Sequence, residues 1–232
     1  MWLLAVDTAT QHTVAGLLHQ QRLVGRLERA GRRHSRYLFE LVDQLLAGAG
    51  IGPAELGALG VGRGPGSFTG VRVGMSWAKT LALSCDIPLV GVSTLEVLAV
   101  GQQEAGHTLV VPVVDALKGQ VYAARYYLSG SQPPQVISTP AAWNPRQLAA
   151  ELAASSEPVW MAGSGLLRYR EIFAESLGRH LLTPRQESAH VPRGDWLARL
   201  AAARLVRQGP DDRHHLEPDY CRLADAELVR SR

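Results

Sequence analysis

The sequence predicts an α/β fold made of two duplicated subdomains, each with a mixed sheet. Three short apolar segments at residues 2–7, 13–18 and 22–29 have the composition of strands joined by polar turns. Helical and strand patterns then alternate to residue 104, which gives the order βββαβαβα of a meander followed by parallel crossover units. After Gly106 the pattern of strand, aspartate, turn and returning strand begins again, which indicates an internal duplication.

The first subdomain is expected to comprise residues 1–105. Its first helix has apolar residues at helical spacing, with Ser35 as the expected N-cap and Gly48 as the expected end. Beyond the three N-terminal strands, the expected elements are helices at residues 37–46, 69–84 and 94–104 and strands at residues 56–61 and 88–92.

The second subdomain, residues 106–232, is expected to be a degenerate copy of the first. Its opening strand ends at Asp115, and Asn144-Pro145 has the N-cap and N1 arrangement of a helix start. The expected elements are strands at residues 108–114, 120–128 and 159–162 and a helix at residues 195–206. The C-terminal tail, from Asp211, is expected to pack back on the first subdomain and to contain a strand at residues 218–223.

The composition favours a protein of the cytoplasm that makes no membrane contact. The 232 residues carry a formal net charge of +3, and no apolar run approaches the ~20 residues that cross a bilayer. No basic segment precedes the short apolar stretch at the N-terminus, which argues against a signal peptide. Cys85 and Cys221 are too few and too far apart to suggest a disulfide framework or a zinc site.

An arginine-rich segment begins at the third strand. Its members are Arg22, Arg26, Arg29, Arg32, Arg33 and Arg36, with only Glu28 of opposite charge among them. Arginine stays charged and offers a rigid donor fork, so such a segment can contact nucleic-acid phosphates. It can also form a solvated strand edge, where charge prevents edge-to-edge pairing. We favour the solvated edge, because no aromatic stacking platform accompanies the arginines.

The glycine-rich segment Gly64–Gly70, GPGSFTG, lies between an expected strand and an expected helix. Glycine lets the backbone approach a ligand or another chain closely, and a helix start exposes N–H groups that attract anions. Alternatively, the segment is a tight turn that caps the helix and packs it against the sheet. It is not a Walker A loop, because neither Lys79 nor Lys118, the lysines of the chain, follows a glycine in the required register.

A second candidate loop lies at the end of the first strand and contains Asp7 and Thr8. It can hold a metal–phosphate group or form an Asx turn. Asp115 has the matching place in the second half, and two aspartates facing across a cleft would resemble the phosphate-binding loops of the actin, Hsp70 and sugar-kinase fold. The turn Gly163–Gly165 would then lie where that fold holds a nucleoside. The candidate phosphate-type residues are Asp7, Thr8, Gly66, Ser67, Thr69, Gly70, Asp115, Gly119, Gly163 and Gly165.

The sequence contains no recognisable catalytic or metal-binding set. The motifs H-E-x-x-H and G-x-S-x-G are absent, and no two histidines lie four residues apart. His214 and His215 are adjacent, so their side chains diverge, and we expect them to be solvated. We therefore expect no catalytic residue and no metal site in this chain.

The helices at residues 37–46 and 71–83 are apolar on more than one face. In the second helix, one stripe consists of Val71, Met75, Ala78 and Ala82, and another of Val73, Trp77 and Leu81. One stripe must cover the sheet, whereas the other needs a partner or a second layer of structure. The residues alone leave core and interface as equal explanations.

Five sequence blocks together resemble the bacterial TsaB (YeaZ) family, in the family's order and over nearly the whole chain. They are LLAVDTAT at 3–10, GRGPGSFTGVRVG at 62–74, PLVGVSTLEVLA at 88–99, DALKGQVYAARY at 115–126 and EPDYCR at 217–222. The first three are specific in combination, whereas the fourth departs from the family pattern at Leu117, Lys118 and Gln120. The resemblance implies the actin-like ATPase (ASKHA, ribonuclease H-like) fold.

The resemblance also implies a role in tRNA modification. Members of the family work with TsaD and TsaE to place threonylcarbamoyl on the adenosine beside the anticodon of ANN-decoding tRNAs. TsaD carries the metal and performs the transfer through an H-x-x-x-H metal motif that this chain lacks, TsaE is an ATPase, and the TsaB type is a shortened, degenerate paralogue of TsaD. We therefore expect a non-catalytic scaffold or activator without a cofactor of its own, and ATP and metal on the partner subunits.

Family members dimerise with TsaD through helices of the first subdomain, which implies a partner surface on the two apolar helices. The implied interface residues are Tyr37, Leu38, Leu41, Val42, Leu45, Val71, Met75, Ala78 and Ala82. The same surface is expected to form a homodimer when TsaD is absent, and contact with tRNA to be indirect or weak.

The competing hypothesis is an ATP-dependent enzyme that acts alone. Such an enzyme would use Asp7, Thr8, Ser67 and Asp115 around a nucleotide and magnesium. A protease is disfavoured, because the sequence offers neither a nucleophile motif nor metal ligands.

Overall fold

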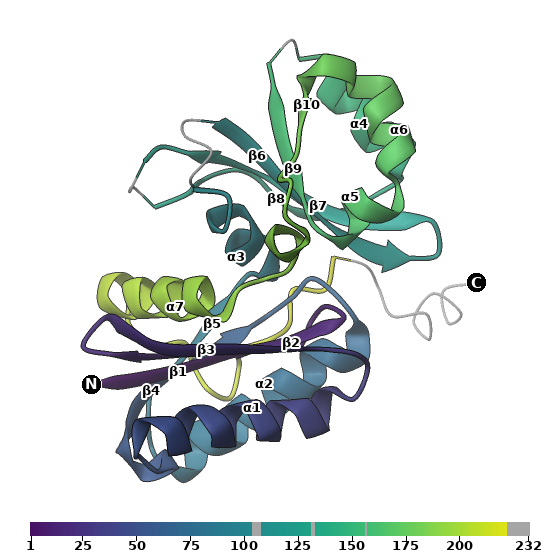
Figure 1. Cartoon of the computed structure of the whole chain (residues 1–232). Coiled ribbons are helices and arrows are strands. Elements are labelled where there is room, and N and C mark those ends of the chain that lie inside the picture. Colours follow the sequence, from purple (N-terminus) through teal and green to yellow (C-terminus); the bar gives the residue numbers. More distant parts are fainter. Residues whose placement is uncertain (104–107, 131–132, 156, 222–232) are drawn as a thin grey trace.

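The protein contains two five-stranded sheets, one in each half of the chain (Figure 1). The computed structural model describes residues 1–103, 108–130, 133–155 and 157–221. Within these residues, no helix is both long enough and apolar enough to cross a bilayer.

The first sheet has the strand order β3-β2-β1-β4-β5. Its strands are β1 (Trp2–Asp7), β2 (His12–His19), β3 (Arg22–Ala30), β4 (Leu56–Gly62) and β5 (Leu89–Val92). Strands β1 to β3 form an antiparallel meander, and β4 and β5 add in parallel on the other side of β1. The central strands β1 and β4 are buried along most of their length, as expected for apolar strands that are covered on both faces.

The second sheet repeats this topology strand for strand, in the order β8-β7-β6-β9-β10. Its strands are β6 (Thr108–Leu117), β7 (Gln120–Leu128), β8 (Gln135–Trp143), β9 (Val159–Ala162) and β10 (Leu181–Leu182). Strands β6 to β8 are antiparallel, and β9 and β10 add in parallel beside β6. The predicted α/β fold of two duplicated subdomains with mixed sheets is therefore confirmed, although the sequence patterns did not predict β8 or β10.

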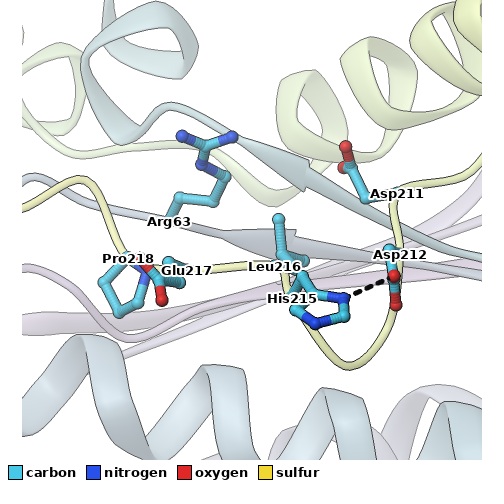
Figure 2. Close-up of a pocket in the computed structure, with 7 residues that line it drawn as sticks. All are labelled: Arg63, Asp211, Asp212, His215, Leu216, Glu217 and Pro218. Atoms are coloured by element: carbon cyan, nitrogen blue, oxygen red, sulfur yellow. Dashed lines mark hydrogen bonds and ion pairs between the residues drawn. The ribbon is translucent and has the colours of Figure 1, made fainter.

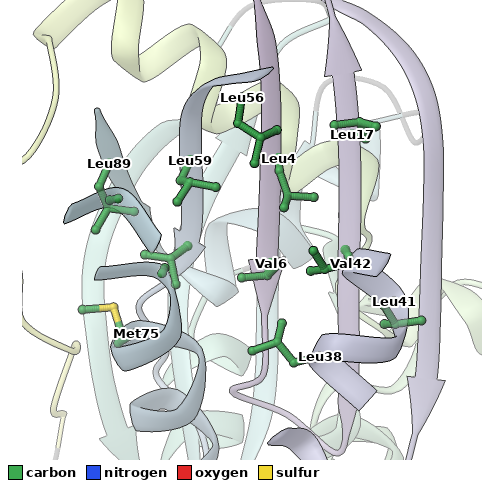
Figure 3. Close-up of a cluster of buried hydrophobic side chains, with 14 of the residues drawn as sticks. Leu4, Val6, Leu17, Leu38, Leu41, Val42, Leu56, Leu59, Met75 and Leu89 are labelled. Carbon is green, nitrogen blue, oxygen red and sulfur yellow. The ribbon is translucent and has the colours of Figure 1, made fainter. Parts of the chain in front are cut away.

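Helices α1 (His34–Ala49) and α2 (Phe68–Ser84) cover one face of the first sheet (Figure 1). Their inward side chains meet those of β1, β2 and β4 in one apolar cluster. Figure 3 shows Leu38 and Leu41 of α1 and Met75 of α2 directed into this cluster, with Leu4 and Leu59 of the sheet. This cluster is the main core of the first subdomain.

The ends of α1 differ from the expected ones. The helix begins at His34 and has no side-chain cap, and its C-cap is Gly50, in the left-handed conformation with φ 69°. Ser35 and Gly48 therefore lie inside the helix. Gly50 is the glycine at which the chain turns toward β4.

Each half supplies a helix to the other half. Helices α4 (Pro145–Ala153), α5 (Ser164–Arg168) and α6 (Arg170–Leu177) cover one face of the second sheet, and α3 (Thr94–Val100), which follows β5, covers the other. In return, α7 (Gly194–Gln208) packs on the first sheet opposite α1 and α2 (Figure 1). Short 3-10 helices lie at Pro53–Glu55, Gly178–His180 and Glu187–His190.

Helix α7 reaches the first sheet through small residues. A β-carbon on Gly16 of β2 would overlap the backbone of Gly194, and one on Gly60 would overlap Ala201. The expected boundary at residue 105 assigned this helix to the second half, with only the tail returning to the first subdomain. The chain thus returns earlier than expected, because the small, buried face of α7 fits the glycine-containing strands of the first sheet.

The C-terminal segment 209–221 continues along the edge strand β5. Asp211 pairs with Leu89, and its carboxylate accepts from the N–H of Gly91 at 2.8 Å and from Arg204 at 3.0 Å. Leu216 is buried in the core beneath α2. Residues 218–221 do not form the expected strand, and residues 222 and 223 lie outside the described residues.

Candidate functional site

Thr8 connects the two candidate loops of the first half by hydrogen bonds. These loops are the β1–β2 turn and the β4–α2 loop with the start of α2. The Thr8 hydroxyl donates to the carbonyl of Gly70 at 2.6 Å and accepts from the N–H of Gly74 at 3.0 Å. Gly70 and Gly74 are four residues apart, so this carbonyl and this N–H are the pair that faces each other in a regular helix. The buried hydroxyl therefore bridges the first turns of α2 and satisfies both groups.

Glycines make this close contact possible. A β-carbon on Gly70 would overlap the carbonyl oxygen of Thr8, and one on Gly66 would overlap that of Ala9. Ser67 completes the contact, because its N–H donates to Ala9 at 2.7 Å and its hydroxyl caps the N–H of Gly70 at 3.3 Å. This geometry favours the tight-turn interpretation of the segment over an open phosphate cradle.

Asp7 lies at the end of β1 and points into the same loop. Its carboxylate accepts from the N–H of Ala9 and from the hydroxyl of Thr94, each at 2.7 Å, and its carboxylate stands where a β-carbon on Gly62 would be. Burial raises the pKa of the Asp7 carboxyl, although these hydrogen bonds oppose the rise. Asp7 thus ties the end of β1 to the start of α3 and has the turn geometry of an Asx motif.

Asp115, at the matching place in the second half, is held by an ion pair. Its carboxylate accepts from Arg168 of α5 at 2.8 Å and from the N–H of Leu117 at 3.1 Å, and its own N–H donates to the hydroxyl of Ser164 at 3.1 Å. The side chain of Arg168 is about half exposed. Sequence reasoning missed Arg168, because it lies 53 positions after Asp115 and gives no local signal.

The turn Gly163–Gly165 packs against β6. β-Carbons at both glycines would overlap Val113, and the N–H of Gly163 donates to Nδ1 of His190 at 3.1 Å. Gly163 also has a φ of 117°, which a residue with a side chain rarely adopts. Gly119 is exposed in the β6–β7 turn, at a φ of 77°.

Two surface hollows lie away from these loops, along the C-terminal segment. Their volumes are about 390 and 580 Å³, and Asp211 and Asp212 line both. Figure 2 shows the first hollow, with Arg63 on one side and His215 bonded to Asp212 at 2.6 Å on the other. None of the candidate loop residues lines either hollow. Among the described residues, no three His, Cys, Asp or Glu side chains could together hold a metal ion.

The predicted interface residues on α1 and α2 belong, with one exception, to the core. Leu38, Leu41, Val42, Leu45, Val71, Met75, Ala78 and Ala82 are each 7% exposed or less. They pack between the helices and the first sheet (Figure 3), so they cannot also contact a partner. The prediction is therefore wrong for these eight residues, and Tyr37 alone of the nine is partly exposed.

The other stripe of α2 faces outward. Val73, Trp77 and Leu81 are partly exposed and pack over the core from outside. Phe39 of α1 is 56% exposed, and Leu83, near the end of α2, is 46% exposed. These five residues are called the outer face below. Sequence reasoning recognised the stripe of Val73, Trp77 and Leu81 on α2 but did not include Leu83, and it missed Phe39, which lies between the core positions of α1.

An aromatic group lies at the start of α2. The guanidinium of Arg72 lies 3.8 Å from the ring centroid of Phe68, and its Nε donates to the hydroxyl of Tyr220 at 2.9 Å. Both rings are exposed, as is Thr69, the residue after Phe68. The C-terminal segment thus extends the exposed surface of α2.

Comparison with known proteins decides the family. The family model described as TsaD, tRNA N6-adenosine threonylcarbamoyltransferase, matches residues 28–229. The tRNA threonylcarbamoyladenosine biosynthesis protein TsaB of Bacillus subtilis is 34% identical over 98% of this chain and 96% of its own length. The chain belongs to the TsaB (YeaZ) family. Escherichia coli TsaB is 39% identical, over 54% of this chain and 55% of its own length.

Solved structures agree with the family and the fold. YeaZ from Pseudomonas aeruginosa is 28% identical and has a TM-score of 0.78, covering 94% of this chain and 99% of that chain. The ethanolamine utilization protein EutJ from Carboxydothermus hydrogenoformans, 13% identical, has a TM-score of 0.52 and covers 85% of this chain and 90% of that chain. The second likeness concerns the fold alone and confirms the actin-like ATPase fold.

Proposed function

We propose that this chain is a non-catalytic subunit in the synthesis of tRNA threonylcarbamoyladenosine and acts by binding a catalytic paralogue. The observation that carries the proposal is that Thr8 and Ser67 bind the first phosphate-type loop to its own chain. The Thr8 and Ser67 hydroxyls and the N–H of Gly74, which could contact a phosphate, are thus already hydrogen-bonded within the chain. The relatives from B. subtilis and E. coli are named as biosynthesis proteins of this modification, which supports the pathway.

The partner is proposed to be a TsaD-type subunit that binds the outer face of α1 and α2. Phe39, Trp77 and Leu83 give this face apolar area that the chain itself leaves exposed or partly exposed. Aromatic and large apolar residues of this kind supply most of the binding energy at protein interfaces.

Charge on the two helices is compatible with pairing between related subunits. Helix α2 carries Arg72 and Lys79 and no acidic residue, whereas α1 carries Asp43 and the pair of Arg36 with Glu40, a net charge of one negative unit. Because the TsaD family model matches this chain, we expect a TsaD-type partner to present related helices. Pairing about a pseudo-two-fold axis can then place α1 of one subunit against α2 of the other, with opposite charges facing. Two copies of this chain can pair in the same way, as a homodimer.

The scheme assigns the cofactors to the partners. ATP and the metal are expected on TsaD and on the ATPase TsaE, and this chain requires none. The site of action is proposed to be the cytoplasm, where tRNA is modified.

Co-elution and reconstituted tRNA modification test the proposal together. Phe39→Asp places a charge on the outer face and is expected to abolish co-elution with the TsaD-type subunit. The modification rate is expected to fall at least ten-fold, which corresponds to a loss of about 1.4 kcal/mol or more in binding free energy. Val136→Asp is the control, because Val136 is 54% exposed on β8 of the second sheet, away from α1 and α2. Circular dichroism checks the fold of both variants. Unchanged co-elution of Phe39→Asp would remove the outer face as the partner surface.

Calorimetric titration with MgATP distinguishes the proposed accessory role from the competing hypothesis of an ATP-dependent enzyme. Micromolar binding with ATP turnover by the isolated chain would contradict the accessory role. Asp7→Asn is expected to support full tRNA modification in the reconstituted system, whereas an enzyme that coordinates magnesium through Asp7 would lose its activity.

A further inference from the structure

A basic group lies where the edge strand β3 meets the start of α7. Asp195 accepts from Arg193 at 2.6 and 3.1 Å and from Arg26 of β3 at 3.1 Å. Burial alone would raise the pKa of Asp195, but the two arginines hold it below its ordinary value. One nearly buried carboxylate thus serves two guanidinium groups. One positive charge remains in excess, on side chains that are 32% and 49% exposed.

Trp196, the next residue, adds an aromatic ring to this group. The guanidinium carbons of Arg193 and Arg199 lie 5.9 and 6.0 Å from its ring centroid, within the range of cation–π attraction. Trp196 is partly exposed and Arg199 is exposed. An indole ring flanked by guanidinium groups can stack on an unpaired nucleobase, while the remaining guanidinium N–H groups bind phosphate oxygens.

The charges on α7 after Asp195 are all positive. They belong to Arg199, Arg204 and Arg207. Arg204 pairs with Asp211, whereas the contact found for Arg199 within the described part of the chain is the ring of Trp196. The exposed apolar residues of this helix are the small Ala203 and Val206, too little apolar surface to anchor a protein in a membrane interface.

We propose that Arg26, Arg193, Trp196 and Arg199 form an RNA-binding surface, with the arginines on backbone phosphates and the indole ring on an unstacked base. The choice of RNA among anionic polymers rests on the proposed function in tRNA modification. The surface lies across the first sheet from α1 and α2 (Figure 1), so RNA and the proposed partner can bind at the same time.

The structure also changes the interpretation of the arginine-rich segment. Arg36 pairs with Glu40 on α1 at 2.6 Å, whereas Arg26 reaches α7. The segment is therefore not one continuous patch. The aromatic platform that the segment lacks comes from Trp196. Trp196 follows Asp195, which pairs with Arg26 although the two residues are 169 positions apart.

Fluorescence anisotropy with a labelled, unmodified tRNA transcript tests the proposal on the full chain at several salt concentrations. Arg199→Gln is expected to weaken binding about five-fold and to lower the slope of log affinity against log salt by about one, because one phosphate contact is lost. Arg146→Gln is the matched control, since Arg146 is exposed on α4 and its loss changes the net charge equally. The control is expected to leave affinity unchanged.

Trp196→Leu separates the base contact from the phosphate contacts. It is expected to weaken binding of the transcript and to leave binding of heparin unchanged, because heparin offers charges but no bases. Thermal unfolding checks the fold. If Trp196→Leu does not fold, Arg26→Gln, at a half-exposed side chain, tests the phosphate contacts and is expected to weaken binding of both the transcript and heparin.

Three outcomes would overturn the RNA-binding surface. They are equal losses for Arg199→Gln and Arg146→Gln, no binding of the transcript by the unchanged chain, and tighter binding to vesicles of anionic phospholipid than to the transcript. The first would mean that affinity follows net charge alone. Because the anisotropy experiment uses the isolated chain, its failure would leave the proposed partner function, measured by co-elution, untouched.

Discussion

The β1–β2 turn and the β6–β7 turn have the same place in the two sheets, but they are fixed by different contacts. In the first half, the buried hydroxyl of Thr8 bonds to the backbone in the first turns of α2, and the backbone of α2 at Gly70 packs directly on the backbone of Thr8. In the second half, Asp115 pairs with the half-exposed Arg168 of α5, a helix of five residues. A buried contact without flexible side chains gives α2 one orientation, and α2 carries the proposed partner surface. The short α5 carries no such surface, and it is placed by the packing of Gly163 and Gly165 on Val113 together with this solvated ion pair.

The helices that end the two halves show a second difference. Helix α3 contributes to the cores of both sheets, since Val97 packs with α7 while Leu95 and Leu98 pack on β6 and β7. Helix α7 packs on the first sheet and exposes Arg199 and Val206 on its other side. The second half therefore completes the first subdomain and at the same time brings it the proposed RNA-binding surface.

Gly70→Ala is expected to have the largest effect and tests whether the first half depends on backbone contact. The added β-carbon overlaps the carbonyl oxygen of Thr8, which cannot move without shifting β1. We expect the free energy of unfolding to fall by about 3 kcal/mol, measured by urea unfolding. Gly48→Ala in α1 is the control, because nothing lies within 4 Å of its added atom, and it is expected to gain about 0.5 kcal/mol. Similar small changes in both variants would break the comparison.

Thr8→Val tests the bridging hydroxyl without changing the shape of the side chain. The substitution leaves the carbonyl of Gly70 and the N–H of Gly74 without their partner, and we expect a loss of about 2 kcal/mol in the free energy of unfolding. Thr80→Val removes a hydroxyl from the exposed side of the same helix, where it bonds to Ser76, and is expected to change stability by less than about 0.5 kcal/mol. Equal losses would mean that the bridge is no more than a surface hydrogen bond.

Elements with local signals were predicted closely from the sequence. Strands β7 and β9 have the expected bounds, and α4 begins at Pro145 after Asn144, whose side chain caps it. Strand β8 was missed because its sequence, QVISTPAAW, combines exposed apolar residues with a proline instead of alternating. Strand β10 has two residues and leaves no pattern. At the end of α1, both Gly48 and Gly50 could stop the helix, and the left-handed conformation with its capping hydrogen bonds occurs at Gly50.

The sequence predicted that the candidate loops lie together, but it did not predict whether they are open to a ligand or closed on one another. Strand ends and helix starts meet at one edge of an α/β sheet, so Asp7, Thr8 and Ser67 were expected together. Whether they surround a ligand or one another depends on contacts such as Thr8 to Gly70, 62 positions apart. The same holds for α2, because both of its stripes are apolar and only the rotation of the helix decides which one is buried. Such rotations follow from packing, which a single sequence does not display.

Asp7→Asn and Asp115→Asn make the same change at matching places in the two halves. We expect them to change the free energy of unfolding in opposite directions. Burial raises the pKa of Asp7 in the folded state, so its contribution to stability falls as pH rises from the unfolded pKa through the folded one. At pH 8, Asp7→Asn is therefore expected to be at least as stable as the unchanged chain. Asp115→Asn loses the ion pair with Arg168 and is expected to be less stable, by less than Thr8→Val, because water screens the pair.

Thermal unfolding at pH 8 and at pH 4.5 measures both aspartate variants. The advantage of Asp7→Asn is expected to shrink at the lower pH, where the native carboxyl takes up its proton. If Asp7→Asn were the less stable of the two at pH 8, the charged carboxylate would be the form that the fold requires. The first loop would then resemble the second.

His190→Asn is expected to have the smallest effect and sharpens the contrast between the halves in its pH dependence. Burial lowers the pKa of His190, the charge of Arg170 adds to this, and the carbonyl of Pro184 and the charge of Glu187 oppose it. The neutral ring accepts from the N–H of Gly163, so the stability it contributes is present above the unfolded pKa of about 6.5 and is lost as pH falls from that value through the lower pKa of the folded state.

Asparagine can accept from the same N–H without titrating, so the fall in stability between about pH 7 and pH 5 should become shallower in His190→Asn than in the unchanged chain. His214→Asn, at an exposed position of the C-terminal segment, is the matched control for the exchange of histidine for asparagine. Asp7 and His190 would then weaken the two halves at opposite ends of the pH range, the first when its carboxyl ionises and the second when its ring is protonated. An unchanged slope in His190→Asn would show that the titration of His190 does not affect the Gly163 turn, and that the packing of its glycines on β6 is what holds the turn.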